Sequence, residues 1–365
     1  MAMINKLNIE RFRGIRELSI DSLNQVNLIV GDNNCGKTSV LEALQLLRTS
    51  GSLANIYKIA RQRESMFGLN SNSIYENFIC MFPKNEKEMR LKISGICNGT
   101  PIAYSLEGRQ SKILMEAGDL DLISRRQNED LNGEFETDVF DGIIRYIFAG
   151  TDFSEEIHVN RFSKISGTQL SKKENIRIVY VAPFEHLRGN TISMIVKNDG
   201  YKEICLKALQ LFDSDIEDMM IFRSDVGNRP VEYLKHKKLG NMPLSTFGDG
   251  IKKVLVLSNA IAKAAGGILL IDEIETAIHK KYYDEIFRFV VKVCKAFQVQ
   301  MFITTHSLEA IDGLLETQDY AVQFSDDLIK VVTLKRGQDN FTYSRVLSGR
   351  EVAENREAFG FEVRL

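Results

Sequence analysis

Hydrophobic and polar residues follow three patterns in the first 50 residues. They alternate over residues 4–12, which predicts a half-buried strand, and residues 26–31 form a nearly continuous apolar run, which predicts a strand buried within a sheet. From residue 37 the apolar positions recur with the period of a helix and share one face: Val40, Leu41, Leu44 and Leu47. The pattern therefore predicts strand, loop and helix in succession.

A sheet-like pattern returns in the second half of the chain. Residues 176–184 predict a buried strand, and residues 250–266 predict a strongly amphipathic helix. A further helix, predicted over residues 280–297, lies between two core strands within residues 267–275 and 298–307. Two strands joined through a helix form a unit in which the strands are parallel.

Residues 51–175 have a different character. Residues 89–108 predict two short strands around the turn-forming sequence Asn-Gly-Thr-Pro, and the polar, acidic residues 127–138 predict an exposed loop. The segment contains neither a fixed-period repeat nor a catalytic cluster. Beyond it, helices are expected to about Met220 and a short β-like piece to Leu234.

These patterns predict one large α/β unit with an insertion, which is within reach of a 365-residue chain. A mixed sheet flanked by helices is expected to form from residues 1–50 and 176–335. Residues 51–175 are expected to be an inserted, mostly α+β structural subdomain, and residues 336–365 a tail.

Composition and charge narrow the class of protein. Hydrophobic residues make up 44% and charged residues 26% of the chain, the balance of a soluble globular protein. The net charge of −2 excludes a chain that is basic overall, and the local basic clusters are short, at residues 11–16, 61–63 and 235–238. A solvated run of charges is the plainer interpretation of each cluster.

The cysteines and the N-terminus indicate the compartment. The five cysteines form no CxxC pair and their number is odd, which indicates reduced thiols and neither a disulfide framework nor a zinc site. The N-terminal residues hold no apolar run long enough for secretion or membrane insertion. We therefore expect a cytoplasmic protein that does not bind membranes.

The loop between the first buried strand and its helix carries the most specific motif. Residues 31–38 fit G-x-x-x-x-G-K-[ST], in the strand–loop–helix context that this phosphate-binding loop requires. Backbone N–H groups at the positive end of the helix surround a phosphate, Lys37 adds charge on the β- and γ-phosphate oxygens, and Thr38 offers a hydroxyl to Mg²⁺. The expected nucleotide-binding residues are Gly31, Asp32, Asn33, Asn34, Cys35, Gly36, Lys37, Thr38 and Ser39.

Cys35 within this loop has two interpretations. A helix N-terminus lowers the pKa of a thiol, which would suit a redox switch. A small side chain that fills a tight loop is the favoured interpretation.

Two acidic residues and a histidine follow buried strands. Asp272 comes at the carboxyl end of its strand, where parallel sheets bind ligands, and is expected to hold Mg²⁺. Glu273 is then near the γ-phosphate and is expected to act as general base on the attacking water. His306 follows the next strand and is expected to bond the γ-phosphate or the water. Glu273, His306 and Lys37 are the expected catalytic residues; an acidic turn and a structural histidine are the plainer alternatives.

A second helix N-terminus able to bind phosphate lies one helix upstream of the acidic strand. Ser245, Gly248 and Gly250 lead directly into the helix predicted over residues 250–266. Serine and glycine are also ordinary helix caps. The indication of phosphate binding therefore depends on the position of this segment, one helix upstream of the acidic strand.

Together these stretches resemble the ABC-class ATPases of the SMC, RecF and OLD type. The matching stretches are residues 7–44 with the Phe-Arg-Gly piece at residues 12–14, residues 244–257 as the signature motif, residues 268–279 as Walker B with D-loop, and residues 302–307 with the switch histidine. The resemblance covers about residues 1–50 and 176–335, and it adds Arg13 to the nucleotide-binding residues.

The resemblance implies a P-loop NTPase of the ABC type that uses ATP and Mg²⁺. Two copies pair head to tail, with ATP between the loop of one copy and the signature segment of the other, and hydrolysis with Glu273 opens the dimer. The chain departs from the usual Ser-x-Gly signature, because it has Gly248-Asp249-Gly250 with Ser245 three residues earlier. It also has Lys280 where a proline often follows the D-loop histidine.

The resemblance further implies a compact member of the OLD type. No long heptad-bearing segment separates the two halves, unlike in SMC proteins, and the residues after His306 are too few for the TOPRIM nuclease domain of full-length OLD enzymes. Compact proteins of this type occur in bacterial anti-phage defence beside a separate effector, a nuclease or a toxin. The leading hypothesis is therefore an ATP-gated dimer that controls such an effector.

Three alternatives remain open. A RecF-like DNA repair or recombination ATPase would bind DNA directly, through a continuous basic surface. A scaffold that binds ATP without hydrolysing it disagrees with the presence of both Asp272 and Glu273. A transporter ATPase subunit would need a membrane partner, and the Phe-Arg-Gly piece and the absent Q-loop sequence argue mildly against it.

Overall fold

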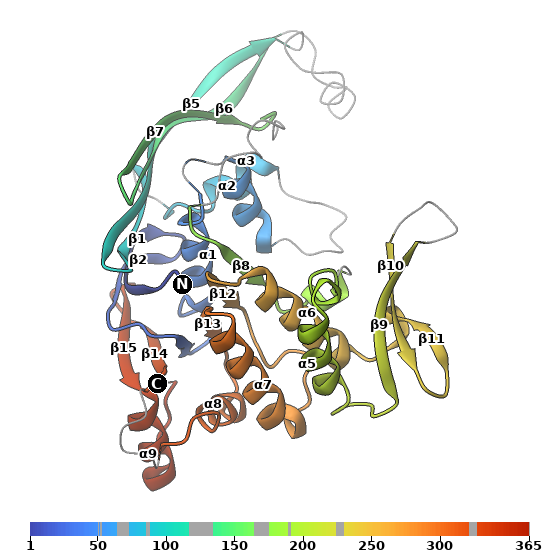
Figure 1. Ribbon diagram of the computed structural model, residues 1–365. Coiled ribbons are helices and arrows are strands. Elements are labelled where there is room, and N and C mark those ends of the chain that lie inside the picture. The colour runs from blue at the N-terminus through green and yellow to red at the C-terminus, as the bar shows by residue number, and fades with distance from the viewer. Residues whose placement is uncertain are drawn as a thin grey trace.

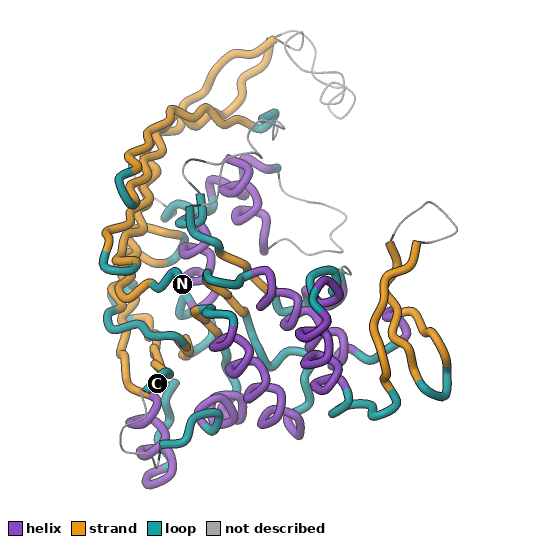
Figure 2. Tube along the Cα trace, viewed as in Figure 1, coloured by secondary structure: helices purple, strands orange, loops and turns teal. Residues whose placement is uncertain are grey.

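The computed structural model describes residues 1–49, 51, 53–63, 73–84, 88–116, 134–163, 175–188, 191–223, 230–320 and 327–364. These residues form three sheets with helices between and beside them (Figure 1). Figure 2 shows strands along two opposite sides of the molecule, with most of the helices between them. In the part of the chain described here, no helix is both long and apolar enough to cross a membrane.

The central sheet contains the strand that precedes the phosphate loop. Its strands lie in the order β15 (Thr342–Ser348), β14 (Ile329–Arg336), β3 (Val26–Gly31), β13 (Gln300–Thr304), β12 (Ile268–Ile271) and β8 (Ile178–Val181). All are parallel except β15, which pairs antiparallel with β14 at the edge. The predicted unit of two parallel strands joined through a helix is confirmed in β12 and β13.

Two hydrophobic cores lie on opposite faces of the central sheet, because successive residues of a strand point to opposite faces. In β3, Ile29 belongs to the first core, and Leu28 and Val30 belong to the second. A strand that is covered on both faces is apolar along most of its length. This double burial explains the nearly continuous apolar run in residues 26–31.

Helices cover both faces of the central sheet. The first core is closed by α1 (Lys37–Leu46), α2 (Leu53–Ala60) and α3 (Ile74–Ile79). The second core is closed by α5 (Asp199–Leu209), α6 (Asp249–Lys263), α7 (Tyr283–Ala296), α8 (Leu308–Leu315) and α9 (Gly349–Phe359). The helices predicted after the phosphate loop, before the acidic strand and between the two core strands are confirmed as α1, α6 and α7.

The second sheet is antiparallel and packs over the first core. Its strands lie in the order β2 (Ile15–Ile20), β1 (Ile4–Phe12), β4 (Met89–Cys97), β5 (Thr100–Glu116), β6 (Glu134–Phe148) and β7 (Thr151–Asn160). Figure 1 shows this sheet as a curved wall beside α1, α2 and α3. Within residues 51–175, the described strands β4 to β7 therefore extend a sheet that β1 and β2 begin, and the helices α2 and α3 share the first core.

Two predictions within residues 51–175 have different outcomes. The hairpin predicted over residues 89–108 is confirmed as β4 and β5, with Asn98 (φ 50°) and Gly99 (φ 75°) in the turn. The exposed loop predicted over residues 127–138 is wrong at its end, because Glu134–Phe148 pairs with β5 and β7 as β6. Residues 127–133 lie outside the described residues.

The third sheet consists of β9 (Ile216–Arg223), β10 (Pro230–His236) and β11 (Gly240–Pro243), in the order β11-β10-β9. It stands beside α5 at the edge of the molecule in Figure 1. The helical structure predicted to about Met220 is wrong beyond Leu209. Ile216 and Met219 are buried because they pack on the second core from a strand, not because they share a helical face.

Candidate nucleotide-binding site

Two glycines shape the loop that follows β3. Gly31 has φ 140°, and a Cβ atom there would lie 2.2 Å from the carbonyl oxygen of Leu334 on β14. Gly36 has φ 107° and is the N-cap of α1. Glycine adopts such conformations without steric cost, so the chain can pass close to β14 and turn into the helix. The first turn of α1 then leaves its N–H groups without intrahelical partners, which suits an anion.

Lys37 is held by the loop that it follows. Its Nζ donates hydrogen bonds to the carbonyl oxygens of Gly31 (2.7 Å) and Asp32 (2.8 Å). A cavity of about 300 Å³ lies beside the loop, and the residues that line it are Asn33, Asn34, Gly36, Lys37, Thr38, Ser39, Arg63 and Glu273. The ammonium group of Lys37 is therefore placed where a phosphate chain would enter.

Cys35 fills the inside of the loop. Its side chain is buried, and its Sγ lies 2.9 Å from the position that a Cβ atom of Gly31 would take. Burial raises the pKa of the Cys35 thiol, and this effect outweighs the nearby charge of Lys37. A thiol with a raised pKa is a poor nucleophile at neutral pH. The geometry favours the packing role over the redox switch.

Asp272 joins the loop to two strands of the central sheet. It is 4% exposed and accepts hydrogen bonds from the hydroxyl groups of Thr38 (3.3 Å), Thr304 (2.5 Å) and Tyr180 (3.1 Å). Burial raises the pKa of Tyr180 and the carboxylate of Asp272 raises it further, so the phenol remains a neutral donor. Thr38 and Asp272 offer a pair of hard oxygen atoms, the type of ligand that Mg²⁺ prefers.

Glu273 has an unusual backbone conformation and faces the same cavity. Its φ is 49°, in the left-handed region that residues other than glycine rarely adopt. Its N–H donates to Oγ1 of Thr304 (2.9 Å), and its carboxylate accepts a hydrogen bond from Thr276 (3.4 Å). Because Glu273 lines the cavity with Lys37 and Thr38, the structure brings three of the expected site residues together.

His306 follows β13 and is held by Glu275, a residue that is not among those expected from the sequence. Oε1 of Glu275 lies 3.1 Å from Nδ1 of His306 and accepts the backbone N–H of His306 at 3.1 Å. The side chain of Glu275 is 9% exposed and that of His306 is 54% exposed. A buried carboxylate therefore presents the imidazole to solvent, and His306 is not among the residues that line the cavity beside the loop.

Two arginines share the buried carboxylate of Glu42 on α1. Nε of Arg13 lies 2.7 Å from this carboxylate, and its Nη2 donates to the carbonyl oxygen of Ile59 (3.2 Å). Nε and Nη2 of Arg63 donate to the two oxygens of Glu42 at 2.8 and 2.6 Å, and Nη2 also donates to Ser39 (2.9 Å). Arg63, and not the expected Arg13, lines the cavity beside the loop.

Ser245, Gly248 and Gly250 do not line the cavity beside the loop. Ser245 belongs to the short 3₁₀ helix η6 (Leu244–Thr246) and lines a separate cavity of about 310 Å³. Gly248 is the N-cap of α6, and a Cβ atom there would meet none of the described atoms within 4 Å. The end of α6 is therefore open to a ligand, and the signature residues do not join the site that contains Glu273.

Lys253 on α6 is buried behind the end of the acidic strand. It is 0% exposed, and its Nζ donates to the carbonyl oxygen of Pro183 (3.2 Å). Burial lowers the pKa of Lys253 to about 8, although the carboxylates of Glu275 and Asp272 favour its charged form. The helix that begins at Gly248 is thus linked by charge to the segment that carries Asp272.

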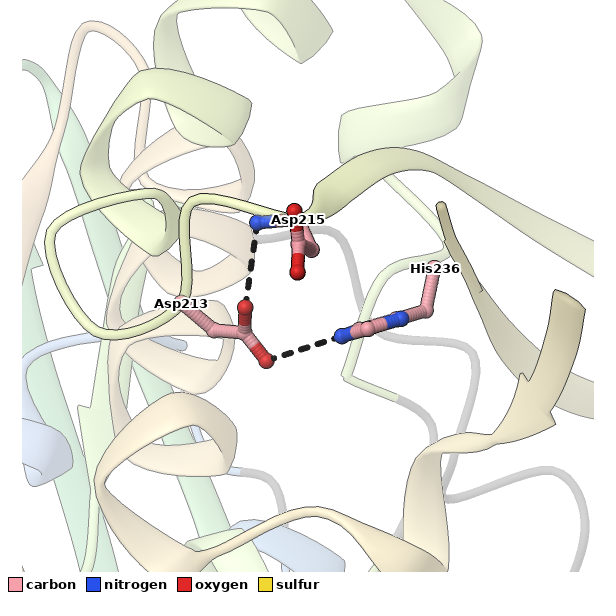
Figure 3. A group of neighbouring side chains, drawn as sticks. All are labelled: Asp213, Asp215 and His236. Atoms are coloured by element: carbon pink, nitrogen blue, oxygen red, sulfur yellow. Dashed lines mark hydrogen bonds and ion pairs between the residues drawn. The ribbon is translucent and has the colours of Figure 1, made fainter. Parts of the chain in front are cut away.

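A group of possible metal ligands lies at the base of the third sheet, away from this site. Figure 3 shows Asp213, Asp215 and His236, whose ligand atoms lie within 4.8 Å of one another. Nε2 of His236 lies 3.3 Å from the carboxylate of Asp213, and Nδ1 accepts the N–H groups of Lys238 (3.1 Å) and Leu239 (3.2 Å). Lys238 also pairs with Asp215 at 2.5 Å. These side chains are used in internal bonds that fasten the β10–β11 turn to the segment after α5.

The chain matches two protein-family models and is similar to several known proteins. Residues 3–211 match the family described as "AAA ATPase domain", and residues 112–312 match the one described as "AAA domain, putative AbiEii toxin, Type IV TA system". The chain is 23% identical over 375 residues to an ATP/GTP phosphatase of Helicobacter pylori, covering 96% of this chain and 97% of that protein. It is 22% identical to the DNA replication and repair protein RecF of Rickettsia canadensis, covering 85% of this chain and 96% of that protein.

Solved structures of SMC head domains also match. An SMC head bound to the C-winged helix domain of ScpA covers 96% of this chain and 99% of its own, at 14% identity and a TM-score of 0.49. The SMC head domain from Thermotoga maritima covers 94% of this chain and 99% of its own, at 13% identity and a TM-score of 0.47.

Proposed function

Because the chain belongs to the family of AAA ATPase domains and is of their ABC class, we propose that it binds ATP at the loop after β3 and hydrolyses it with Glu273 as general base. The observation that carries this proposal is one cavity that Lys37, Thr38 and Glu273 line together. Asp272 is bonded to Thr38 at the same place. Phosphoryl transfer to water needs these groups: a cation on the phosphates, oxygen ligands for a metal ion and a base near the water.

Nucleotide binding uses the backbone first. The N–H groups of the loop and of the first turn of α1 bind phosphate oxygens, and the Nζ of Lys37 exchanges its two backbone carbonyl partners for the β- and γ-phosphates. Thr38 and Asp272 would hold Mg²⁺, which neutralises charge on the phosphates when it is bound. Arg63 adds positive charge at the same cavity, because Glu42 neutralises only one of the two arginines that it binds.

Hydrolysis uses the groups on the other side of the cavity. Glu273 accepts a proton from the attacking water, and its N–H bond to Thr304 holds its backbone beside Asp272. His306 bonds the γ-phosphate or the water through Nε2, because Nδ1 faces Glu275. The name of the Helicobacter pylori relative, an ATP/GTP phosphatase, supports hydrolysis.

The active form proposed here is a head-to-tail dimer. Ser245 and Gly248 lie in a part of the chain that does not line the cavity with Lys37. The N-terminus of α6 carries no side-chain cap, so its N–H groups suit a phosphate. A second copy brings that helix end to the γ-phosphate, and ATP then holds the two copies together.

The dimer is proposed to gate a separate effector, a nuclease or a toxin, in bacterial anti-phage defence in the cytoplasm. The second family description, which names a putative toxin of a type IV toxin–antitoxin system, supports a place in such systems. The relative from Helicobacter pylori, which matches this chain over almost its whole length, supports a protein that acts through nucleotide hydrolysis.

The substitution Glu273→Gln tests this proposal. The variant is expected to bind ATP, to lose hydrolysis by at least about 100-fold, and to elute as a dimer in size-exclusion chromatography with ATP and Mg²⁺. Glu285→Gln, on the exposed side of α7, is the matched control and is expected to leave both properties unchanged. Normal hydrolysis by the Glu273→Gln protein would remove the base from the mechanism.

A RecF-like ATPase that binds DNA directly is the second candidate, favoured by the match over 96% of a RecF protein. Direct binding to the DNA backbone needs exposed, uncompensated basic side chains. In the three basic clusters, several basic residues pair with carboxylates: Arg13 and Arg63 with Glu42, Lys235 with Glu217, and Lys238 with Asp215. These pairings favour the dimer that acts on a protein partner.

A further inference from the structure

His306 is bonded from both sides of its backbone by two residues that are not among those expected from the sequence, Glu275 and Arg364. On the amide side, Oε1 of Glu275 accepts the backbone N–H and contacts Nδ1 of the ring. On the carbonyl side, Nη1 of Arg364 donates to the carbonyl oxygen of His306 at 2.9 Å. The two peptide groups that flank this histidine are thus fixed by side chains from distant segments.

The guanidinium group of Arg364 is itself oriented. Its Nε and Nη2 donate to the two carboxylate oxygens of Glu362 at 2.7 and 2.8 Å. This two-point pairing fixes the plane of the guanidinium group. The third guanidinium nitrogen, Nη1, takes no part in this pairing and donates to the carbonyl oxygen of His306.

The backbone around Arg364 is anchored to the central sheet. Val363 is buried, and its carbonyl oxygen accepts a hydrogen bond from Thr333 on β14 (2.7 Å). Arg356 on α9 donates to the carbonyl oxygen of Phe361 (2.8 Å). Arg364 is therefore anchored to β14, which is the neighbour of β3, the strand that precedes the phosphate loop.

The positive charge of Arg364 also interacts with carboxylates near the phosphate loop. The pKa of Arg364 is raised mainly by its hydrogen bond to Glu362, and to a smaller extent by the carboxylates of Asp32 in the loop and Glu309 at the start of α8. The residue therefore lies within electrostatic range of the loop while it bonds the histidine. A purely structural cross-link between α9 and the sheet would not require its side chain to end at His306.

We propose that Arg364 and Glu275 are positioning residues that hold His306 from opposite sides, so that its Nε2 keeps one orientation toward the bound nucleotide. The inference rests on the role of His306 in the proposed function. The carboxylate of Glu275 accepts from Nδ1, which leaves Nε2 as the ring nitrogen for a phosphate oxygen or a water. Arg364 supplies the second fixed point, without which the peptide group after His306 can rotate.

Arg364→Ala tests the proposal in the full chain. We expect kcat for ATP hydrolysis to fall roughly 10-fold, because displaced catalytic groups lose rate, and ATP affinity in calorimetry to change less than twofold. Arg364→Lys should recover part of kcat, because one ammonium group can still reach the carbonyl oxygen. Arg288→Ala is the control, since Arg288 is exposed and pairs with Asp284 on its own helix α7, and it should leave kcat unchanged.

A double substitution separates positioning from general stability. If Arg364 acts through His306, Arg364→Ala should cause no further loss of kcat in a His306→Ala protein. Losses that multiply would show that Arg364 acts by another route and would overturn the proposal.

A measurement that does not depend on hydrolysis keeps this inference separate from the proposed function. The chain has five histidines, so their ring nitrogens can be resolved in a ¹⁵N-histidine spectrum and the His306 signals assigned with His306→Gln. In Arg364→Ala the His306 ring signals should shift or broaden while the other four stay in place. Unchanged His306 signals would overturn the positioning role, whereas shifted signals in a protein without ATPase activity would support it and refute the proposed function.

Discussion

A lysine side chain with no exposed surface destabilises the folded state, because its charged form loses hydration. Lys253 is in this position, with its Nζ bonded to the carbonyl oxygen of Pro183 and its pKa lowered by burial to about 8. At about 1.4 kcal/mol per pKa unit, keeping it charged at neutral pH costs about 3 kcal/mol. The buried ammonium group of Lys253 therefore lowers the stability of the folded state, although it balances the negative charge of Glu275 and Asp272.

The substitution Lys253→Met should reveal this cost. The pKa is lower in the folded state, so the penalty is present in full below pH 8 and is removed as the pH rises toward the unfolded value of 10.5. Urea unfolding should show the variant more stable than the natural chain at pH 7, by up to about 3 kcal/mol, and by less at pH 10. A variant that is destabilised equally at both pH values would contradict this account.

At the level of elements, the loop after β3 depends on close contact between two strands. The position of a Cβ atom on Gly31 overlaps the carbonyl oxygen of Leu334, and its φ of 140° is unfavourable for other residues. The backbone must therefore shift at β14 to admit any side chain. Because β14 pairs with β3 from Val26 to Gly31, a shift there disturbs the whole central sheet.

Gly31→Ala should consequently lower the free energy of unfolding by about 3 kcal/mol or more. Gly200→Ala on α5 is the matched control, because the nearest atom to its Cβ position is 3.7 Å away and its φ is not positive; it should be neutral or slightly stabilising. Thermal unfolding of the two variants compares them. Equal melting temperatures would show that the loop tolerates a side chain.

The elements that the sequence predicts well are those with strong periodic patterns. The β3–loop–α1 unit and the β12–α7–β13 unit depend on buried strands and an amphipathic helix, and both are confirmed. The helix predicted to about Met220 is wrong because residues 216–223 are a short strand whose burial comes from packing on a distant core. Ile216 and Met219 are the buried residues of this strand, and two positions are too few to show the alternation that identifies a strand.

Three site residues that are not among those expected from the sequence could not be predicted for a related reason. Arg63 belongs to a short basic cluster, and nothing in that cluster indicates a contact with Ser39 beside the loop. Glu275 and Arg364 meet at His306 only because β13, the acidic segment and the end of α9 converge there. Convergence of distant segments is a property of the tertiary structure, which no local pattern contains.

At the scale of the whole molecule, we propose a site that is divided between two copies. The loop and Glu273 lie at one cavity, and the open end of α6 at Gly248 lies elsewhere. Gly248→Asp is a suitable variant of the second half-site: its Cβ has open space, aspartate is a good N-cap, and its carboxylate repels a phosphate. Lys37→Ala removes the first half-site.

Each of these two variants alone should lack ATPase activity, and an equimolar mixture should recover it. In a head-to-tail dimer, each mixed pair has one site with both defects and one intact site, so random exchange predicts about a quarter of the natural rate. Mixing either variant with itself is the control. A mixture that stays inactive, although mass spectrometry detects mixed dimers, would contradict the shared site.

The place of β3 in the central sheet also determines when the loop can form. β3 ends at residue 31, yet its neighbours β13 and β14 begin at Gln300 and Ile329. A chain leaves the ribosome at roughly 5–20 residues per second, so the phosphate loop waits for about 300 residues, on the order of tens of seconds, before either neighbour exists. Contacts so distant in sequence slow folding. The first motif to be synthesised is therefore among the last to be held in place, because a chain that ends before β13 lacks both strands that flank β3.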